Sequence, residues 1–153
     1  MNMNTNLLRS VLFCLLSIFA IQHAQADDNE WPFKEGNYWE VTGIKVADGA
    51  GLKYANWLAK EWRKNLEFAV SEGWLESYYV ISNVHPRADE PDLYLVRIFK
   101  NMATAEENEK RQEKYMAWVK KSMEKMQDES GDRAEYRTIM STSLLQEMHF
   151  RDK

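Results

Sequence analysis

Residues 74–99 read WLESYYVISNVHPRADEPDLYLVRIF, which is two runs rich in β-branched and aromatic residues around a segment with two prolines. Trp74–Val84 and Leu93–Phe99 have the composition of β-strands. Residues 85–91, which contain both prolines, have the composition of a turn. The short connection between the runs predicts an antiparallel hairpin.

A helical segment precedes this hairpin. From about Leu52 to Glu72 apolar residues recur every three or four positions, and Gly73 supplies a stop signal. The run before it, Tyr38–Val46, alternates like a strand and changes phase at Gly43, which predicts a β-bulge there. The expected buried stripe of the helix consists of Ala55, Leu58, Ala59, Trp62, Leu66 and Ala69.

A second helix and a last strand follow the hairpin. Thr104 and Glu107 have the spacing of a capping box, in which each side chain accepts a hydrogen bond from the other residue's backbone N–H. The helix that begins there is expected to end at Gly131. Tyr136–Ser143 has the pattern of the last strand, and Leu144–Phe150 extends it either as strand or as a short helix.

The elements follow the order strand-helix-strand, twice. This βαββαβ order predicts an α+β, ferredoxin-like domain over residues 38–150, with a four-stranded antiparallel sheet and two helices on one face. Residues 27–37 form a short N-terminal extension. Apolar residues occupy both parities of Leu93–Phe99, so both faces of the sheet are apolar. A second copy of the sheet would cover the outer face, and we therefore expect a homodimer.

The first 26 residues have the three parts of an export signal. A polar start with Arg9 precedes an apolar run from Val11 to Ile21, and Ala24-Gln25-Ala26 is a cleavage signature. We expect residues 1–26 to be removed and the protein to be periplasmic or secreted. The apolar run would be about 16 Å long as a helix, too short for a membrane span, and no span is expected after cleavage.

Composition limits the chemistry of the remaining chain. The 153 residues include 20 basic and 24 acidic side chains and one cysteine, with a net charge of −4. Because Arg9 and Cys14 lie in the signal, the other 127 residues carry a net charge of −5 and no thiol. Disulfides, thiolate metal sites and a cysteine nucleophile are thereby excluded, and nucleic acid is a poor partner for an acidic chain. No metal or nucleotide motif is present, and we expect no cofactor.

Arg97 interrupts an otherwise apolar strand. Its parity places it in a cavity or at the dimer seam, where a guanidinium needs a carboxylate or a ligand anion. An edge position or a structural ion pair is the simpler alternative. On the preceding strand, Tyr79, Asn83 and His85 share one parity and could face the same space as Arg97.

The tryptophans supply a further candidate. Trp57, together with Tyr54 and Phe68, falls on the flank of the first helix rather than on its apolar stripe. A tryptophan in such a position can line the mouth of a pocket, but packing in the core or at a dimer contact is the favoured explanation.

The element order, the helix lengths and the two-sided strands of Tyr38–Phe150 resemble the dimeric α+β barrel superfamily, which includes antibiotic biosynthesis monooxygenase-like proteins. The resemblance implies a sheet-to-sheet dimer with a cavity between sheet and helices for an aromatic or hydrophobic ligand. Heme-degrading members carry a histidine ligand on a helix. Neither expected helix contains a histidine, since only His85 and His149 follow the signal, so heme degradation is not expected.

Two functions of different class follow. The first is an exported homodimer that binds a small hydrophobic or aromatic ligand through Arg97, Tyr79, Asn83 and Trp57. The second is a cofactor-independent monooxygenase or isomerase acting on a phenolic or quinone-like substrate. There, Arg97 would stabilise an oxyanion and Tyr79 or His85 would move a proton. The sequence does not decide whether the chain is an enzyme, and the second function requires these three side chains to converge on one cavity.

Overall fold

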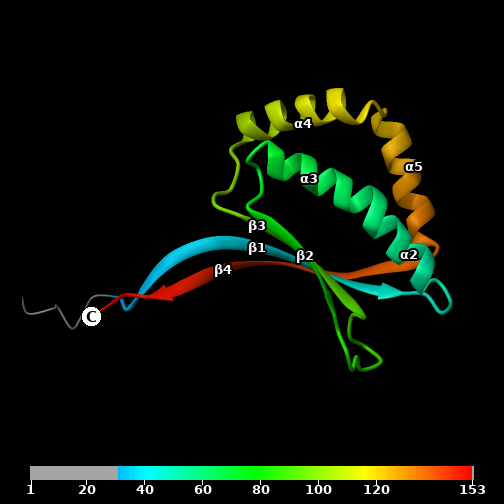
Figure 1. Ribbon diagram of the computed structural model, residues 1–153, viewed down its shortest axis with the longest axis horizontal. Coiled ribbons are helices and arrows are strands. Elements are labelled where there is room, and N and C mark those ends of the chain that lie inside the picture. Colours follow the sequence, from blue (N-terminus) through cyan, green and yellow to red (C-terminus); the bar gives the residue numbers. More distant parts are fainter. Residues whose placement is uncertain (1–30, 153) are drawn as a thin grey trace, which may run out of the picture. The chain divides into compact units, whose positions relative to one another are not determined.

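The computed structural model describes residues 31–152, and the expected export signal at residues 1–26 lies outside the described residues. Phe33–Arg151 forms one compact unit. The unit is α+β and contains four antiparallel strands with helices on one side of the sheet (Figure 1).

The sheet has the strand order β2-β3-β1-β4. Its strands are β1 (Phe33–Val46), β2 (Ser77–Ser82), β3 (Leu93–Phe99) and β4 (Arg137–Phe150). Because β1 and β2 each pair antiparallel with β3, they run parallel to one another with β3 between them. The arrangement is compatible with a ferredoxin-like fold.

The strands agree with the expected ones in number and order but differ at their ends. β3 has the expected bounds, whereas β1 begins five residues early and β2 is shorter than Trp74–Val84. β4 continues as strand to Phe150, which decides between the two alternatives for its last part. The bulge at Gly43 is confirmed, since the β1–β4 register shifts between Gly43 and Ile44. A Cβ at Gly43 would lie 2.7 Å from Pro91 Cγ, so a larger residue would clash there.

The first helix comprises α2 (Gly51–Trp57), a π-helical segment η1 (Leu58–Trp62) and α3 (Arg63–Ser71). The expected buried stripe is only partly right. Tyr54 and Phe68, which the periodicity placed on the flank, are buried, whereas Ala55 and Ala59 are exposed. Tyr54 precedes the π-segment and is buried because it packs in a cluster with Ile44 and Tyr136. After Leu58 the wider turn of the π-segment changes the face that the following residues present, which a regular 3.6-residue period does not represent.

The second helix is broken, which corrects the expectation of one helix ending at Gly131. It consists of α4 (Ala105–Val119) and α5 (Met123–Ala134), and Gly131 lies inside α5. Lys120 ends α4 in the left-handed conformation with φ 54°, and the Ser122 side chain accepts a hydrogen bond from Lys125 N to start α5. The capping box at the start of α4 is confirmed.

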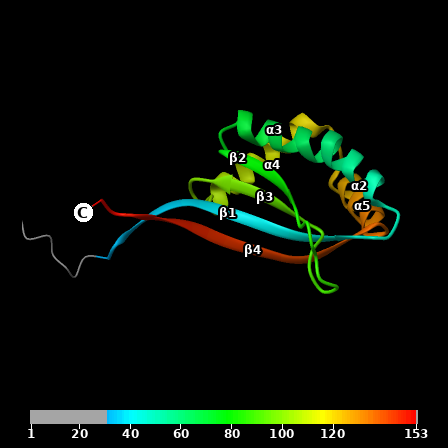
Figure 2. The ribbon, with the colours of Figure 1, turned by 60° about the horizontal axis from the view of Figure 1, so that its bottom comes forward.

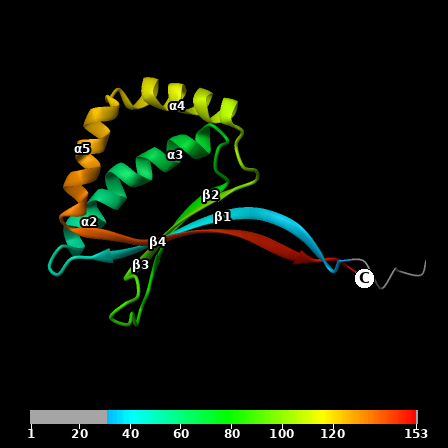
Figure 3. The ribbon, with the colours of Figure 1, turned by 180° about the vertical axis from the view of Figure 1, so that it is seen from behind.

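The helices form two layers above the sheet, as Figures 1 and 3 show from opposite sides. The α2–η1–α3 segment lies next to the sheet, and α4 lies on α3 rather than on the strands. Phe68 joins the two layers, because its ring stacks on Trp118 with the centroids 4.3 Å apart. α5 descends from α4 to the beginning of β4, so that the helices form an arch over one end of the sheet.

The best-packed part of the core lies under the foot of this arch. Ile44, Tyr54, Leu58 and Tyr136 form a buried cluster and leave between 1% and 9% of their surface exposed. Leu93 and Leu95 pack against the cluster from β3. This side of the sheet is therefore the inner face, and Figure 2 shows the strands that carry it from another direction.

The opposite, outer face of the sheet is buried at its centre, where Val96 and Ile98 on β3 are 1% and 5% exposed, and keeps large apolar side chains in contact with solvent around them. Tyr79 and Ile81 on β2 and Leu145 on β4 are 49%, 45% and 53% exposed. β1 and β4 also continue as a two-stranded ribbon past the end of β3 (Figure 1), and Phe150 at its tip is 78% exposed.

Candidate functional site

Arg97 lies on the inner face and forms an ion pair with Glu40. The two residues are direct partners in the β1–β3 register, and opposite charges at such positions attract across the strands. The pair is partly exposed, with 44% of the Arg97 side chain and 26% of the Glu40 side chain accessible. Arg97 therefore fits two of the expected alternatives at once. It belongs to a cross-strand ion pair, and it also lines a cavity.

A cavity of about 490 Å³ lies beside Arg97, between the inner face and the helices. Its aromatic wall comes from the first helix, which contributes Tyr54, Trp57 and Trp62. Its floor comes from the sheet, and α5 closes one end. The remaining lining residues are Thr42, Ile44, Leu95, Arg97, Ser130, Arg133, Arg137 and Ile139.

Tyr54 is the most deeply buried of the aromatic residues in this wall. Only 1% of its surface is exposed, and its ring stacks on Trp57 with centroids 5.7 Å apart. The hydroxyl is buried and has no hydrogen-bond partner. Burial raises the pKa of this hydroxyl, while Arg137 and Arg133 act in the opposite direction. A phenol with a raised pKa remains protonated at neutral pH and is therefore a hydrogen-bond donor without an acceptor.

A second, smaller cavity of about 290 Å³ lies on the other side of the Arg97–Glu40 pair. Trp74 and Phe99 contribute its aromatic surface, and the Arg111 guanidinium lies 5.8 Å from the centre of the Trp74 ring. Arg97 lines both cavities, so the ion pair stands between two hollows of the same inner face.

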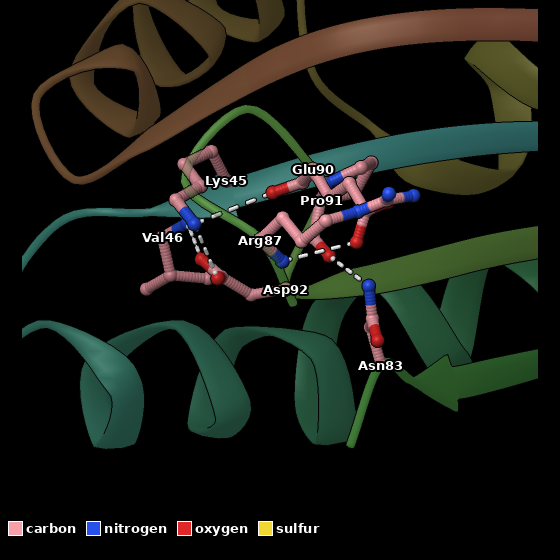
Figure 4. Close-up of polar contacts among 7 residues, drawn as sticks. All are labelled: Lys45, Val46, Asn83, Arg87, Glu90, Pro91 and Asp92. Atoms are coloured by element: carbon pink, nitrogen blue, oxygen red, sulfur yellow. Dashed lines mark hydrogen bonds and ion pairs between the residues drawn. The ribbon is translucent and has the colours of Figure 1, made fainter. Parts of the chain in front are cut away.

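The other polar candidates are not brought to this site. In the strand register Arg97 opposes Tyr78, whereas Tyr79 opposes Val96 and therefore lies on the outer face. His85 is exposed in the loop between β2 and β3. Asn83 closes that loop, since its Nδ2 donates to the Pro91 carbonyl at 3.0 Å (Figure 4). The expectation that these residues face the same space as Arg97 is wrong, because alternation along β2 does not show which of its residues oppose Arg97, and the register to β3 pairs Arg97 with Tyr78.

The loop containing His85 is fixed to the end of β1 by polar contacts (Figure 4). Lys45 Nζ lies 2.8 Å from Asp92 Oδ1, and the Val46 backbone N–H donates to Asp92 Oδ2 at 2.8 Å. These two hydrogen bonds lower the pKa of Asp92. The contacts hold the β2–β3 connection in place and away from the cavities, which argues for a structural role of this loop.

Replacing Asp92 with Asn should lower the free energy of unfolding at pH 7 by about 0.5–1 kcal/mol, because the pair with Lys45 is partly exposed. A lowered pKa stabilises the fold above the unfolded-state value. The difference between wild type and D92N should therefore shrink as the pH falls below about 3.9. Urea denaturation at pH 7 and in acid measures it. Asp89→Asn, in the same loop, is the control, and an equal loss there would contradict the role of Asp92.

Trp57 and Arg97 are the two sequence candidates that line the same cavity. The sequence reasoning missed Arg133 and Arg137, which close the end of the cavity under α5. The Arg133 guanidinium stacks over Trp57 at 4.6 Å from the ring centre, and its Nη1 donates to the Glu129 carbonyl. In the sequence they are two arginines four positions apart. That spacing does not indicate a shared cavity unless it is known that a helix ends and β4 begins between them.

The polar groups of the larger cavity are suited to binding. Guanidinium groups do not give up a proton near neutral pH, and a tyrosine with a raised pKa is a weak acid. Within residues 31–152, no histidine or carboxylate that would serve as a general base lines the cavity. Among residues 31–152, no group of three or more His, Cys, Asp and Glu side chains is placed to hold a metal ion.

Comparison with family models, curated proteins and solved structures finds no match to this chain. In the part of the chain that the structure describes, every helix is too short or too polar to cross a membrane.

Proposed function

We propose that this chain is a small binding protein, and that the larger cavity between its sheet and its helices holds a hydrophobic or aromatic ligand. The observation that carries the proposal is the cavity of about 490 Å³ with Tyr54, Trp57 and Trp62 along one wall. Its size falls within the common range of small-molecule sites, and aromatic walls with a few polar groups are typical of them. The positions of Tyr79 and His85, away from Arg97, favour binding over the monooxygenase or isomerase alternative.

We further propose a ferredoxin-like domain of the dimeric α+β barrel type, in which a second copy of the chain covers the outer face. The placement of β3 between the parallel strands β1 and β2 supports this assignment. The outer-face residues of β1 in this region are Trp39, Val41 and Gly43. Neither they nor the residues that lie beside them on β3, β2 and β4 are charged. The half-exposed apolar side chains of this uncharged face, such as Tyr79 and Leu145, surround the buried Val96 and Ile98 and suit a self-complementary contact.

We also propose that the protein is exported. The polar start, the apolar run Val11–Ile21 and the Ala24-Gln25-Ala26 signature support cleavage after Ala26 and a periplasmic or secreted protein. A binding protein without cysteine keeps the same covalent structure in an oxidising compartment.

Binding can be tested with the neutral fluorescent dye N-phenylnaphthylamine. We expect the wild-type protein to bind it with a dissociation constant of tens of micromolar or tighter, measured by fluorescence titration. Ile139 is 52% exposed and lines the cavity, so Ile139→Trp should fill part of the space. We expect this variant to bind the dye at least about fivefold more weakly.

Ile81→Trp is the matched control, because Ile81 is a half-exposed strand isoleucine on the outer face. It should bind the dye as the wild type does. If both variants bind the dye equally weakly, the dye does not bind specifically in the larger cavity. If the wild type does not bind the dye, the proposed binding function is refuted.

A further inference from the structure

The end of the larger cavity under α5 is positively charged. Arg133 lies in the last turn of α5 and Arg137 is the first residue of β4, and both side chains line the cavity together with Arg97. Among the residues that the structure describes, the lining includes no Asp or Glu. Three guanidinium groups therefore border an aromatic space that contributes no negative charge of its own.

The three arginines differ in how their charge is balanced. Glu40 neutralises Arg97. Among residues 31–152, by contrast, no carboxylate forms an ion pair with Arg133 or Arg137. Arg133 Nη1 donates a hydrogen bond to the Glu129 carbonyl, and Arg133 Nε is buried without a hydrogen-bond partner. Both arginine side chains are only partly buried, but a polar atom that is closed to solvent is normally hydrogen-bonded, so Arg133 Nε lacks an acceptor.

Tyr54 gives the second, independent indication. Its side chain is almost fully buried and lines the same cavity, and its hydroxyl has no partner. The positive charges that act on this hydroxyl are those of Arg137 and Arg133. The two buried polar side-chain atoms without partners in the described structure, Tyr54 Oη and Arg133 Nε, thus belong to residues that line one cavity.

We infer that the larger cavity selects an aromatic molecule with one anionic group, such as a carboxylate or sulfonate. The anionic group lies between Arg133 and Arg137 and accepts a hydrogen bond from the Tyr54 hydroxyl, while the rings of the ligand pack along Trp62 and against the edge of Trp57, whose ring already contacts Tyr54 and Arg133. An anion supplies the acceptor that both unpartnered donors lack and balances the unpaired guanidinium charge. This inference rests on the proposed binding function and adds the chemical class of the ligand.

Two dyes with the same rings separate the inference from the proposed function. Anilinonaphthalenesulfonate differs from N-phenylnaphthylamine by its sulfonate, so their affinities compare an anionic and a neutral ligand of the same skeleton. We expect the wild type to bind the sulfonate at least about tenfold more tightly. Equal or weaker binding of the sulfonate would overturn the inference and leave the binding function standing, whereas failure of both dyes would overturn both.

Variants of the lining residues test where the anionic group of the sulfonate dye binds. Arg137→Gln should reduce the affinity for the sulfonate by about tenfold and leave the neutral dye unchanged, and Tyr54→Phe, which removes only the hydroxyl, should reduce it by about fivefold. Arg87→Gln removes the same charge from the exposed β2–β3 loop and should change neither affinity. If Arg137→Gln and Tyr54→Phe both retain the wild-type preference for the sulfonate, or if Arg87→Gln loses it, the anionic group does not lie where we infer.

Discussion

Replacing Ile44 with Ala should lower the free energy of unfolding by about 2–5 kcal/mol. Ile44 is 1% exposed and lies at the centre of the cluster that joins β1 to the first helix and to Tyr136. The substitution removes buried methyl and methylene groups and leaves a space that its rigid neighbours cannot fill. Urea denaturation followed by circular dichroism at neutral pH measures the change.

Ile139→Ala provides the matched control. Ile139 is the direct partner of Ile44 in the β1–β4 register and shares its inner face, but it is 52% exposed. We expect this control to cost less than about 1 kcal/mol. If the two alanine variants lose equal stability, the cluster around Ile44 is not the best-packed part of the core.

The strands were predictable because their signals are local. Alternation and β-branched composition give β3 its bounds, and the phase change at Gly43 locates the bulge. The capping box at Thr104 was equally visible, because its two hydrogen bonds join residues three positions apart. Each of these features depends on a few neighbouring residues, which is the scale on which composition and spacing act.

The helices were less predictable because their faces depend on more distant contacts. The π-segment at Leu58–Trp62 changes the buried face of the first helix, and the spacing of apolar residues in the sequence does not predict this segment. Phe68 is buried because α4 stacks Trp118 on it, a contact between two helices far apart in the sequence. The break at Lys120 depends on a left-handed residue that is not glycine, the conformation that sequence patterns predict least well.

The candidate site required the strand register. Tyr79 and Arg97 each have a clear parity along their own strand, but only the pairing of Tyr78 with Arg97 shows that Tyr79 faces the other way. Arg133 and Arg137 meet the first helix only after the chain has passed through α5 into β4. Their function as a charged end of the cavity therefore depends on tertiary structure.

Replacing Tyr79 with Lys should convert the protein from dimer to monomer. The proposed dimer buries the outer face, and a lysine there would place an unpaired charge against an uncharged sheet. A cost of several kcal/mol corresponds to a dimer dissociation constant at least about a hundredfold higher. Sedimentation velocity at micromolar concentration should show a dimer for the wild type and a monomer for the variant.

Val80→Lys is the control that distinguishes a charge on the outer face from the general effect of placing a lysine on β2. Val80 is the next residue on β2 and is equally exposed at 49%, but it opposes Leu95 and lies on the inner side of the sheet. This variant should remain dimeric. Because the larger cavity lies on the inner face, the monomeric Tyr79→Lys protein should still bind N-phenylnaphthylamine. A wild type that sediments as a monomer, or a Val80→Lys variant that dissociates as readily as Tyr79→Lys, would contradict a dimer through the outer face.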